Sequence, residues 1–196
     1  MQDVAKLEKI EKDPLFRALI EHATFERVAR ALIEGPIVIY RAVLFNKPPH
    51  GGTVLPFHQD GGSFWGLDQD PFLQIWVALD DAPIGSGCLE FVPKTHHKGL
   101  ATPLGGLIPE AVIEAAGARE KSVLVPAKAG EAILVHNHVW HGSGVNETDL
   151  PRRGVSICYM SAERRCMRKR RAPREFVSVF EGRGVDPSAI TMETVD

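Results

Sequence analysis

The chain has 196 residues, of which 44% are hydrophobic and 24% charged, and its formal net charge is -2 at pH 7. This length suffices for one domain with a full hydrophobic core, and the slightly acidic balance argues against nucleic-acid binding by the chain as a whole. No apolar run is long enough to cross a bilayer, and the first residues lack a secretory signal. The three cysteines have no metal-binding spacing and are typical of free thiols. We therefore expect a cytoplasmic protein without membrane association.

The first residues, up to about residue 34, predict helices. Leu7 and Ile10 give a short amphipathic turn, and Asp13-Pro14 is a helix start with proline at the first helical position. Apolar residues then recur at helical spacing up to Ile33, and Gly35-Pro36 ends that helix.

After Pro36 the sequence consists of short strands separated by Gly/Pro turns. The expected strands are residues 37–45, 72–79, 88–92, 122–126, 131–136 and 153–160, with a surface helix inserted over residues 109–118. This pattern predicts a mainly β protein with flanking helices, folded as a double-stranded β-helix, the cupin-like jelly roll. We expect a single domain over residues 1–196, made of a helical lead-in (1–36), a jelly-roll core (37–160) and a basic C-terminal segment (161–196).

A metal site is indicated by His58-Gln59-Asp60. Residues i and i+2 of a strand point to one face, so His58 and Asp60 converge while Gln59 points away. Two histidines and one carboxylate form the facial triad that holds non-haem Fe(II). His141 is the preferred third ligand because Gly142-Ser143-Gly144 follows it directly and lets the backbone approach a ligand closely. His136 and His138 are rivals, and both also fit core or surface positions.

An arginine after the second histidine would suit a carboxylate cosubstrate, because its planar guanidinium binds carboxylates with two parallel hydrogen bonds. Arg152 and Arg153 are both candidates. The small residues Gly154, Ser156 and Cys158 share strand parity with Arg152, whereas bulky residues share parity with Arg153. A ligand cavity needs space, so Arg152 is favoured and Arg153 is expected at the surface or in a salt bridge.

Four ordered motifs resemble the phytanoyl-CoA dioxygenase family of Fe(II)/2-oxoglutarate oxygenases over residues 37–160. They are Asn46-Lys47-Pro48-Pro49, Phe57-His58-Gln59-Asp60, Gly87-Cys88-Leu89-Glu90-Phe91-Val92-Pro93-Lys94-Thr95-His96, and Trp140-His141-Gly142-Ser143-Gly144-Val145-Asn146 followed by Arg152.

The resemblance implies that His58, Asp60 and His141 bind Fe(II) and act in catalysis. It further implies a 2-oxoglutarate site, formed by Arg152, Ser143, Lys47 and Trp76. The implied reaction uses O2 to hydroxylate or otherwise oxidise a small organic substrate, with release of succinate and CO2. Halogenases of this class lack the carboxylate ligand, so the presence of Asp60 favours hydroxylation or desaturation.

The prime substrate is left open by the sequence, with Phe64, Trp65 and Gln74 as expected substrate-binding residues. Members of the family usually carry a longer N-terminal region that closes the pocket. Three alternatives would explain its shortness here: the pocket is open, a partner subunit of a homo-oligomer supplies the missing walls, or the sequence is shortened. A cupin-like metalloenzyme that does not use 2-oxoglutarate and a non-catalytic metal- or ligand-binding module are the alternative functions. The basic run over residues 164–174 is interpreted as a solvated face or tail, or else as a rim that attracts an anionic substrate.

Overall fold

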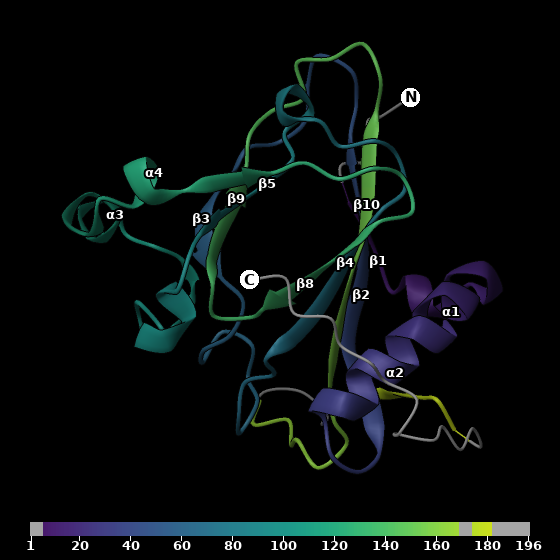
Figure 1. Ribbon diagram of the computed structural model, residues 1–196. Helices are drawn as coiled ribbons and strands as arrows, with labels where there is room; N and C mark the ends of the chain where they lie inside the picture. Colours follow the sequence, from purple (N-terminus) through teal and green to yellow (C-terminus); the bar gives the residue numbers. More distant parts are fainter. Residues whose placement is uncertain (1–5, 169–173, 182–196) are drawn as a thin grey trace.

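Two antiparallel β-sheets face each other across the molecule, as the computed structural model of residues 6–168 and 174–181 shows (Figure 1). One sheet has six strands and the other five. This arrangement confirms the expected mainly β architecture with flanking helices, in which the two sheets of a double-stranded β-helix enclose the space between them.

The larger sheet has the strand order β1-β2-β10-β4-β8, with β11 also paired to β2. Its strands are β1 (Lys6–Glu8), β2 (Ile37–Lys47), β4 (Leu73–Ala78), β8 (Ala132–His136), β10 (Arg152–Ser161) and β11 (Val177–Val179). Alternation along β10 divides its side chains between two faces: Val155, Ile157 and Tyr159 enter the main hydrophobic core, while Arg152 and Ser156 face the other sheet. The expected parity of this strand is confirmed.

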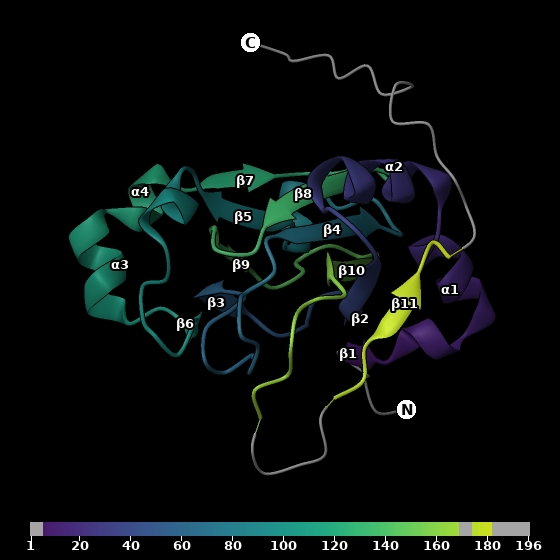
Figure 2. The ribbon, with the colours of Figure 1, turned by 90° about the horizontal axis from the view of Figure 1, so that it is seen from below.

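Two helices, α1 (Pro14–Ile20) and α2 (Ala23–Leu32), cover the outer face of the larger sheet (Figures 1 and 2). Pro14 occupies the first turn of α1, and the Asp13 side chain caps that helix by accepting from the backbone N–H of Leu15 at 2.9 Å. The hydroxyl of Tyr159 donates to the carbonyl of Ile20 at 2.7 Å and so ties α1 to the sheet. Among the described residues, no helix is both long enough and apolar enough to cross a membrane.

The smaller sheet has the order β6-β3-β9-β5-β7. Its strands are β6 (Gly106–Leu107), β3 (Leu55–Gln59), β9 (Trp140–Ser143), β5 (Leu89–Val92) and β7 (Val123–Val125). The helices α3 (Glu110–Ala116) and α4 (Ala118–Lys121) lie beside this sheet (Figure 2). Short 3-10 turns over Ile10–Lys12, Ile84–Ser86 and Thr95–Lys98 complete the connections.

One expectation about the N-terminal residues is corrected, and the expected surface helix is found. The amphipathic turn expected around Leu7 is instead the strand β1, because its backbone pairs with Val43–Phe45 and satisfies the otherwise open edge of β2. The surface helix expected over residues 109–118 is present as α3, which ends at Gly117 with a left-handed φ of 56°, and the short helix α4 follows it.

Candidate metal centre and adjoining cavity

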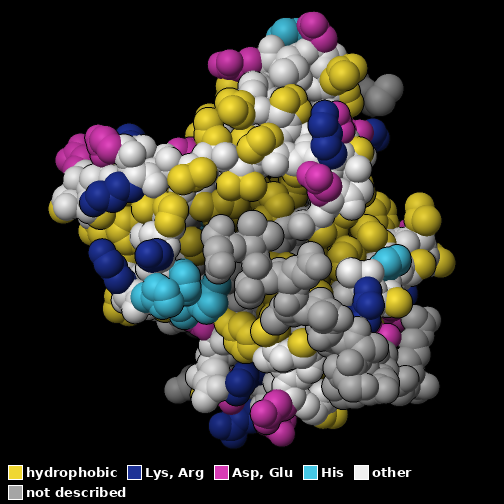
Figure 3. All heavy atoms as spheres, in the orientation of Figure 1, with side chains coloured by type: hydrophobic (Ala, Val, Ile, Leu, Met, Phe, Trp, Pro, Cys, Tyr) yellow, Lys and Arg dark blue, Asp and Glu magenta, His cyan; other side chains and the backbone are white. Residues whose placement is uncertain are grey.

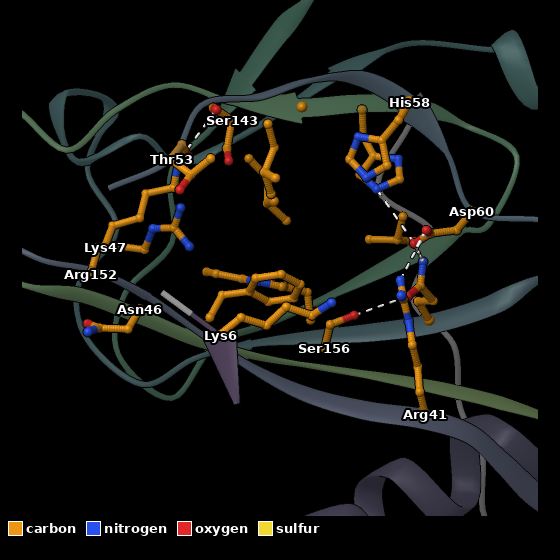
Figure 4. Close-up of a pocket in the computed structure, with 18 residues that line it drawn as sticks. Lys6, Arg41, Asn46, Lys47, Thr53, His58, Asp60, Ser143, Arg152 and Ser156 are labelled. Carbon is orange, nitrogen blue, oxygen red and sulfur yellow. Dashed lines mark hydrogen bonds and ion pairs between the residues drawn. The ribbon is translucent and has the colours of Figure 1, made fainter. Parts of the chain in front are cut away.

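A cavity of about 230 Å³ lies between the two sheets and receives side chains from both (Figure 4). Apolar walls come from Phe45, Leu55, Trp76, Leu89 and Val135. On the molecular surface, hydrophobic side chains (yellow in Figure 3) cover much of the face shown there. Most of its polar and charged side chains lie at the two ends of the cavity, while Lys6 of β1, paired with Glu8, extends between them (Figure 4).

At one end, His58, Asp60 and His141 offer ligand atoms that all lie within 4.8 Å of one another. His58 on β3 and His141 on β9 are register partners, and their ring centroids are 4.1 Å apart. Asp60 follows β3 directly, and its Oδ2 lies 3.8 Å from Nε2 of His141. The structure therefore brings together the three residues in which the sequence predicted a metal site.

Backbone carbonyls orient both imidazoles. Nδ1 of His58 lies 2.9 Å from the carbonyl of Pro56, and Nδ1 of His141 lies 2.9 Å from that of Val139. A carbonyl only accepts, so each Nδ1 carries the proton and each Nε2 keeps its lone pair for a metal. Burial and the neighbouring His58 lower the pKa of His141 to about 4, which keeps its ring neutral at pH 7, as metal ligation requires.

Asp60 is buried and held by two donors. Nη2 of Arg41 donates to its Oδ1 at 3.0 Å, and Nε2 of Gln74 donates to its Oδ2 at 2.6 Å. Ser156 in turn donates to Oε1 of Gln74 at 3.1 Å and fixes the amide. Burial alone would raise the pKa of Asp60, but Arg41 and the two histidines lower it, so the carboxylate is ionised.

The opposite end of the cavity is cationic. Arg152 is 2% exposed and donates through Nη2 to the carbonyl of Gly87 at 2.7 Å, while its Nε is buried without a hydrogen-bond partner among the described residues. Lys47, its register partner on β2, donates to the carbonyls of Thr53 at 2.8 Å and of Gly144. The hydroxyl of Ser143 is also buried without a partner in the described part of the chain.

Burial affects both cations at this end. It lowers the pKa of Arg152 to about 10, and burial together with the charge of Arg152 lowers that of Lys47 to about 8. Both groups remain cationic at pH 7, and buried charges without a counter-charge are costly. An anion placed here would relieve that cost and also satisfy the hydroxyl of Ser143.

Trp76 forms the wall between the two ends, and its place depends on Gly154 of β10. A Cβ on Gly154 would lie 2.3 Å from Cζ2 of Trp76, so any larger residue would displace the indole. The guanidinium of Arg152 lies 5.8 Å from the Trp76 ring. Arg153 points outside the cavity, where Nε and Nη2 each bind the Asp80 carboxylate at 2.7 Å and half of its side chain is exposed.

The expected substrate residues have different positions. Gln74 lines the cavity, as proposed, although its amide is engaged with Asp60. Phe64 is 67% exposed, and Trp65 is buried against Tyr40 in a separate hydrophobic cluster, so neither borders the cavity. Arg41 was missed by the sequence reasoning, although a lone arginine within the apolar run Ile37–Phe45 was a usable signal.

The rival histidines lie outside the cavity. Nε2 of His138 pairs with Oδ2 of Asp70 at 3.0 Å, and its ring centroid is 5.6 Å from that of His136. His96 lies 4.9 Å from His136 and 4.0 Å from His97 by ring centroids. Histidine side chains form a visible group on this face of the molecule (Figure 3).

The described part of the basic run contacts neighbouring loops and strand β2. Arg165 pairs with Asp68 at 3.1 Å, Arg168 donates to the carbonyls of Phe64 and Trp65, and the guanidinium of Arg174 lies 4.6 Å from the Tyr40 ring. The central part of the run, residues 169–173, lies outside the described residues.

Known proteins resemble the chain in sequence. The sequence model of the phytanoyl-CoA dioxygenase family matches residues 2–154. The phytanoyl-CoA dioxygenase domain-containing protein 1 of Bos taurus is 31% identical over 158 residues, which are 76% of this chain and 54% of that protein. The phytanoyl-CoA dioxygenase of Arabidopsis thaliana is 30% identical over 155 residues, 75% of this chain and 53% of that protein. The chain thus spans about half the length of these curated relatives.

Solved structures share the fold. The α-ketoglutarate dependent carbocyclase SnoK from nogalamycin biosynthesis has a TM-score of 0.72 at 22% identity, over 89% of this chain and 75% of that one. EctD from S. alaskensis, solved with 2-oxoglutarate and 5-hydroxyectoine, has a TM-score of 0.70 at 23% identity, over 83% of this chain and 58% of that one. The family match covers well over half of the chain, and with the architecture and the site described above it shows that the chain belongs to the phytanoyl-CoA dioxygenase family.

Proposed function

We propose that this protein is an Fe(II)- and 2-oxoglutarate-dependent dioxygenase that oxidises a small organic molecule. The observation that carries the proposal is the pairing, within one cavity, of a His/Asp/His cluster at one end with a buried cationic end at the other. A metal site alone would fit a cupin-like enzyme, and the cationic end alone would fit an anion-binding module. Their combination suits a cosubstrate that binds a metal with one end and a cation with the other.

The residues at the first end fit Fe(II). His58 and His141 present neutral Nε2 atoms, and Asp60 presents one carboxylate oxygen, which together make the facial triad that leaves three positions open. Gln74 donates a hydrogen bond to the Asp60 carboxylate and is not itself one of the metal ligands. We therefore assign metal binding to these three residues.

The residues at the other end fit a dicarboxylic 2-oxo acid. Arg152 would bind the distal carboxylate with its unpartnered Nε and a second guanidinium nitrogen, Ser143 would donate its hydroxyl, and Lys47 would add charge. Trp76 would pack against the methylene carbons between the two carboxylates. The named relatives EctD, solved with 2-oxoglutarate, and SnoK, described as α-ketoglutarate dependent, support this assignment.

Bound iron and 2-oxoglutarate would supply O2 activation coupled to release of succinate and CO2. The chain's own contribution is to orient both groups and to exclude water with the apolar walls Phe45, Leu55 and Val135. Because Asp60 occupies the carboxylate position, no ligand site is left for a halide in its place. We therefore propose hydroxylation or a related oxidation such as desaturation.

Anaerobic addition of Fe(II) and then 2-oxoglutarate tests the proposal. Chelation of the metal by the 2-oxo acid should give a weak visible charge-transfer band, which Asp60→Ala should abolish. A protein that binds Fe(II) but gives no band, and releases no succinate with any of a panel of small molecules, would favour the cupin-like alternative. Failure to bind Fe(II) at all would reject the proposal.

A further inference from the structure

The guanidinium of Arg41 reaches the metal-facing carboxylate from outside the ligand cluster. Its Nη2 donates to Oδ1 of Asp60 at 3.0 Å. The other oxygen, Oδ2, lies 3.8 Å from Nε2 of His141 and accepts from the neutral Gln74 amide at 2.6 Å. Figure 4 shows Arg41 extending toward Asp60 on the side opposite His58. The two oxygens of one carboxylate thus have different neighbours.

Arg41 owes this orientation to a β-bulge. Along β2, Arg41 pairs with Cys158 and Ile39 pairs with Tyr159, so Tyr40 is an extra residue without a partner in β10. A bulge re-aims the side chains next to it. Tyr40 and Arg41 consequently lie on the same side of β2, away from the helices.

An aromatic stack holds the guanidinium in place. Its Cζ lies 4.8 Å from the Trp65 ring centroid, and the Trp65 and Tyr40 rings stack 4.2 Å apart at an interplanar angle of 8°. The Arg174 guanidinium lies 4.6 Å from the Tyr40 ring centroid. Because the stacked Tyr40 and Trp65 rings leave no room between them, Arg174 covers the face of Tyr40 that points away from Trp65. Nε of Arg41 is buried without a hydrogen-bond partner among the described residues, so the stack and Asp60 are what orient this side chain.

We propose that Arg41 is a positioning residue of the metal centre: stacked on Trp65, it places a positive charge beside Oδ1 of Asp60, opposes metal binding at that oxygen and so restricts this ligand to Oδ2. The neutral Gln74 amide on Oδ2 leaves that oxygen a lone pair for the metal. The inference rests on the proposed function. A carboxylate can bind a metal with one or both oxygens. In a six-coordinate site, single-oxygen binding by Asp60 leaves two positions for the 2-oxo acid and one for O2, whereas two-oxygen binding would remove one of them.

This role predicts a specific split between two affinities in the Arg41→Met protein. The freed Oδ1 would become an additional ligand and a positive charge would leave, so Co(II), used as a stable probe, should bind as tightly as in the wild type or more tightly. The affinity of the Co(II)-loaded protein for 2-oxoglutarate should fall by about tenfold or more, because the 2-oxo acid would first have to displace Oδ1, and a cost of about 1.4 kcal/mol corresponds to that factor. The visible Co(II) spectrum, which reports coordination number, should change before 2-oxoglutarate is added.

Conservative variants separate positioning from general packing. Arg41→Lys keeps the charge but loses the planar stacking group, so it should restore part of the lost affinity. Trp65→Phe retains an aromatic ring and should weaken 2-oxoglutarate binding by a few-fold. The double variant Arg41→Met/Trp65→Phe should bind 2-oxoglutarate no more weakly than Arg41→Met alone, because Trp65 acts through Arg41.

Arg153→Met is the matched control, because it also removes an arginine that pairs with an aspartate, but outside the cavity. It should change neither affinity nor the spectrum. A loss of Co(II) affinity in Arg41→Met would overturn the proposal, since it would show that Arg41 helps to retain the metal. Wild-type affinities for both ligands in that variant would overturn it as well. If the wild type binds neither Co(II) nor 2-oxoglutarate, the proposed function itself fails.

Discussion

Substitution of Arg152 by lysine probes the cationic end of the cavity most directly. One guanidinium nitrogen of Arg152 already donates to Gly87 at 2.7 Å, and Nε remains unpartnered for a ligand. A lysine nitrogen cannot serve Gly87 and form two parallel hydrogen bonds to a carboxylate. The variant should therefore lose at least one charge-assisted hydrogen bond to 2-oxoglutarate, worth about 1.5–3 kcal/mol, which corresponds to a roughly 10- to 150-fold higher Kd.

Calorimetric titration of 2-oxoglutarate into the Co(II)-loaded Arg152→Lys protein would measure this change. Metal affinity should be unaffected, because Arg152 and the metal ligands lie at opposite ends of the cavity (Figure 4). Arg153→Lys is the control and should alter the Kd less than about twofold, since its carboxylate partner Asp80 lies outside the cavity. A larger effect of Arg153→Lys than of Arg152→Lys would refute the assignment of the cosubstrate end.

Three further outcomes are expected. His141→Ala should weaken Co(II) binding at least about 100-fold in a competition titration. His138→Ala, which removes the partner of Asp70, should change the Co(II) affinity by no more than a few-fold. The reverse ranking would reject His141 as the third metal ligand. The affinity for 2-oxoglutarate should fall as pH rises above about 8, by up to about tenfold per pH unit. Burial lowers the pKa of Lys47 to about 8, and only the protonated lysine attracts the anion. Lys47→Met should weaken binding and flatten this pH profile. Tyr159→Phe should lower the free energy of unfolding by about 1–3 kcal/mol in urea denaturation, because the buried carbonyl of Ile20 loses its donor, and an unchanged value would show that water replaces the hydroxyl.

Much of the candidate site followed from local sequence rules. Strand parity placed His58 and Asp60 on one side and Gln59 on the other, and in the structure the Gln59 amide donates to the carbonyls of Gly99 and His138, away from the ligand cluster. The same rule separated Arg152 from Arg153, because β10 alternates regularly at that end. Predictions of this kind depend only on the period of the strand.

Other features had no local signal. Trp65 follows Asp60 closely in sequence, but a glycine-rich turn intervenes and directs it to Tyr40 rather than to the cavity. β1 is too short to be recognised by its pattern, and it forms because the edge of β2 offers unpaired backbone groups. Both outcomes depend on partners that are distant in sequence.

The sequence by itself determined the fold class and the choice of metal-ligand candidates, because the period of each strand and the spacing of the motifs are local properties. The tertiary structure alone decided what surrounds Asp60. Strict alternation along β2 from Ile37 and Ile39 would turn Arg41 toward the helices, and the bulge at Tyr40 reverses that orientation. A bulge is a mismatch between two paired strands, so it becomes visible only when β10 lies beside β2.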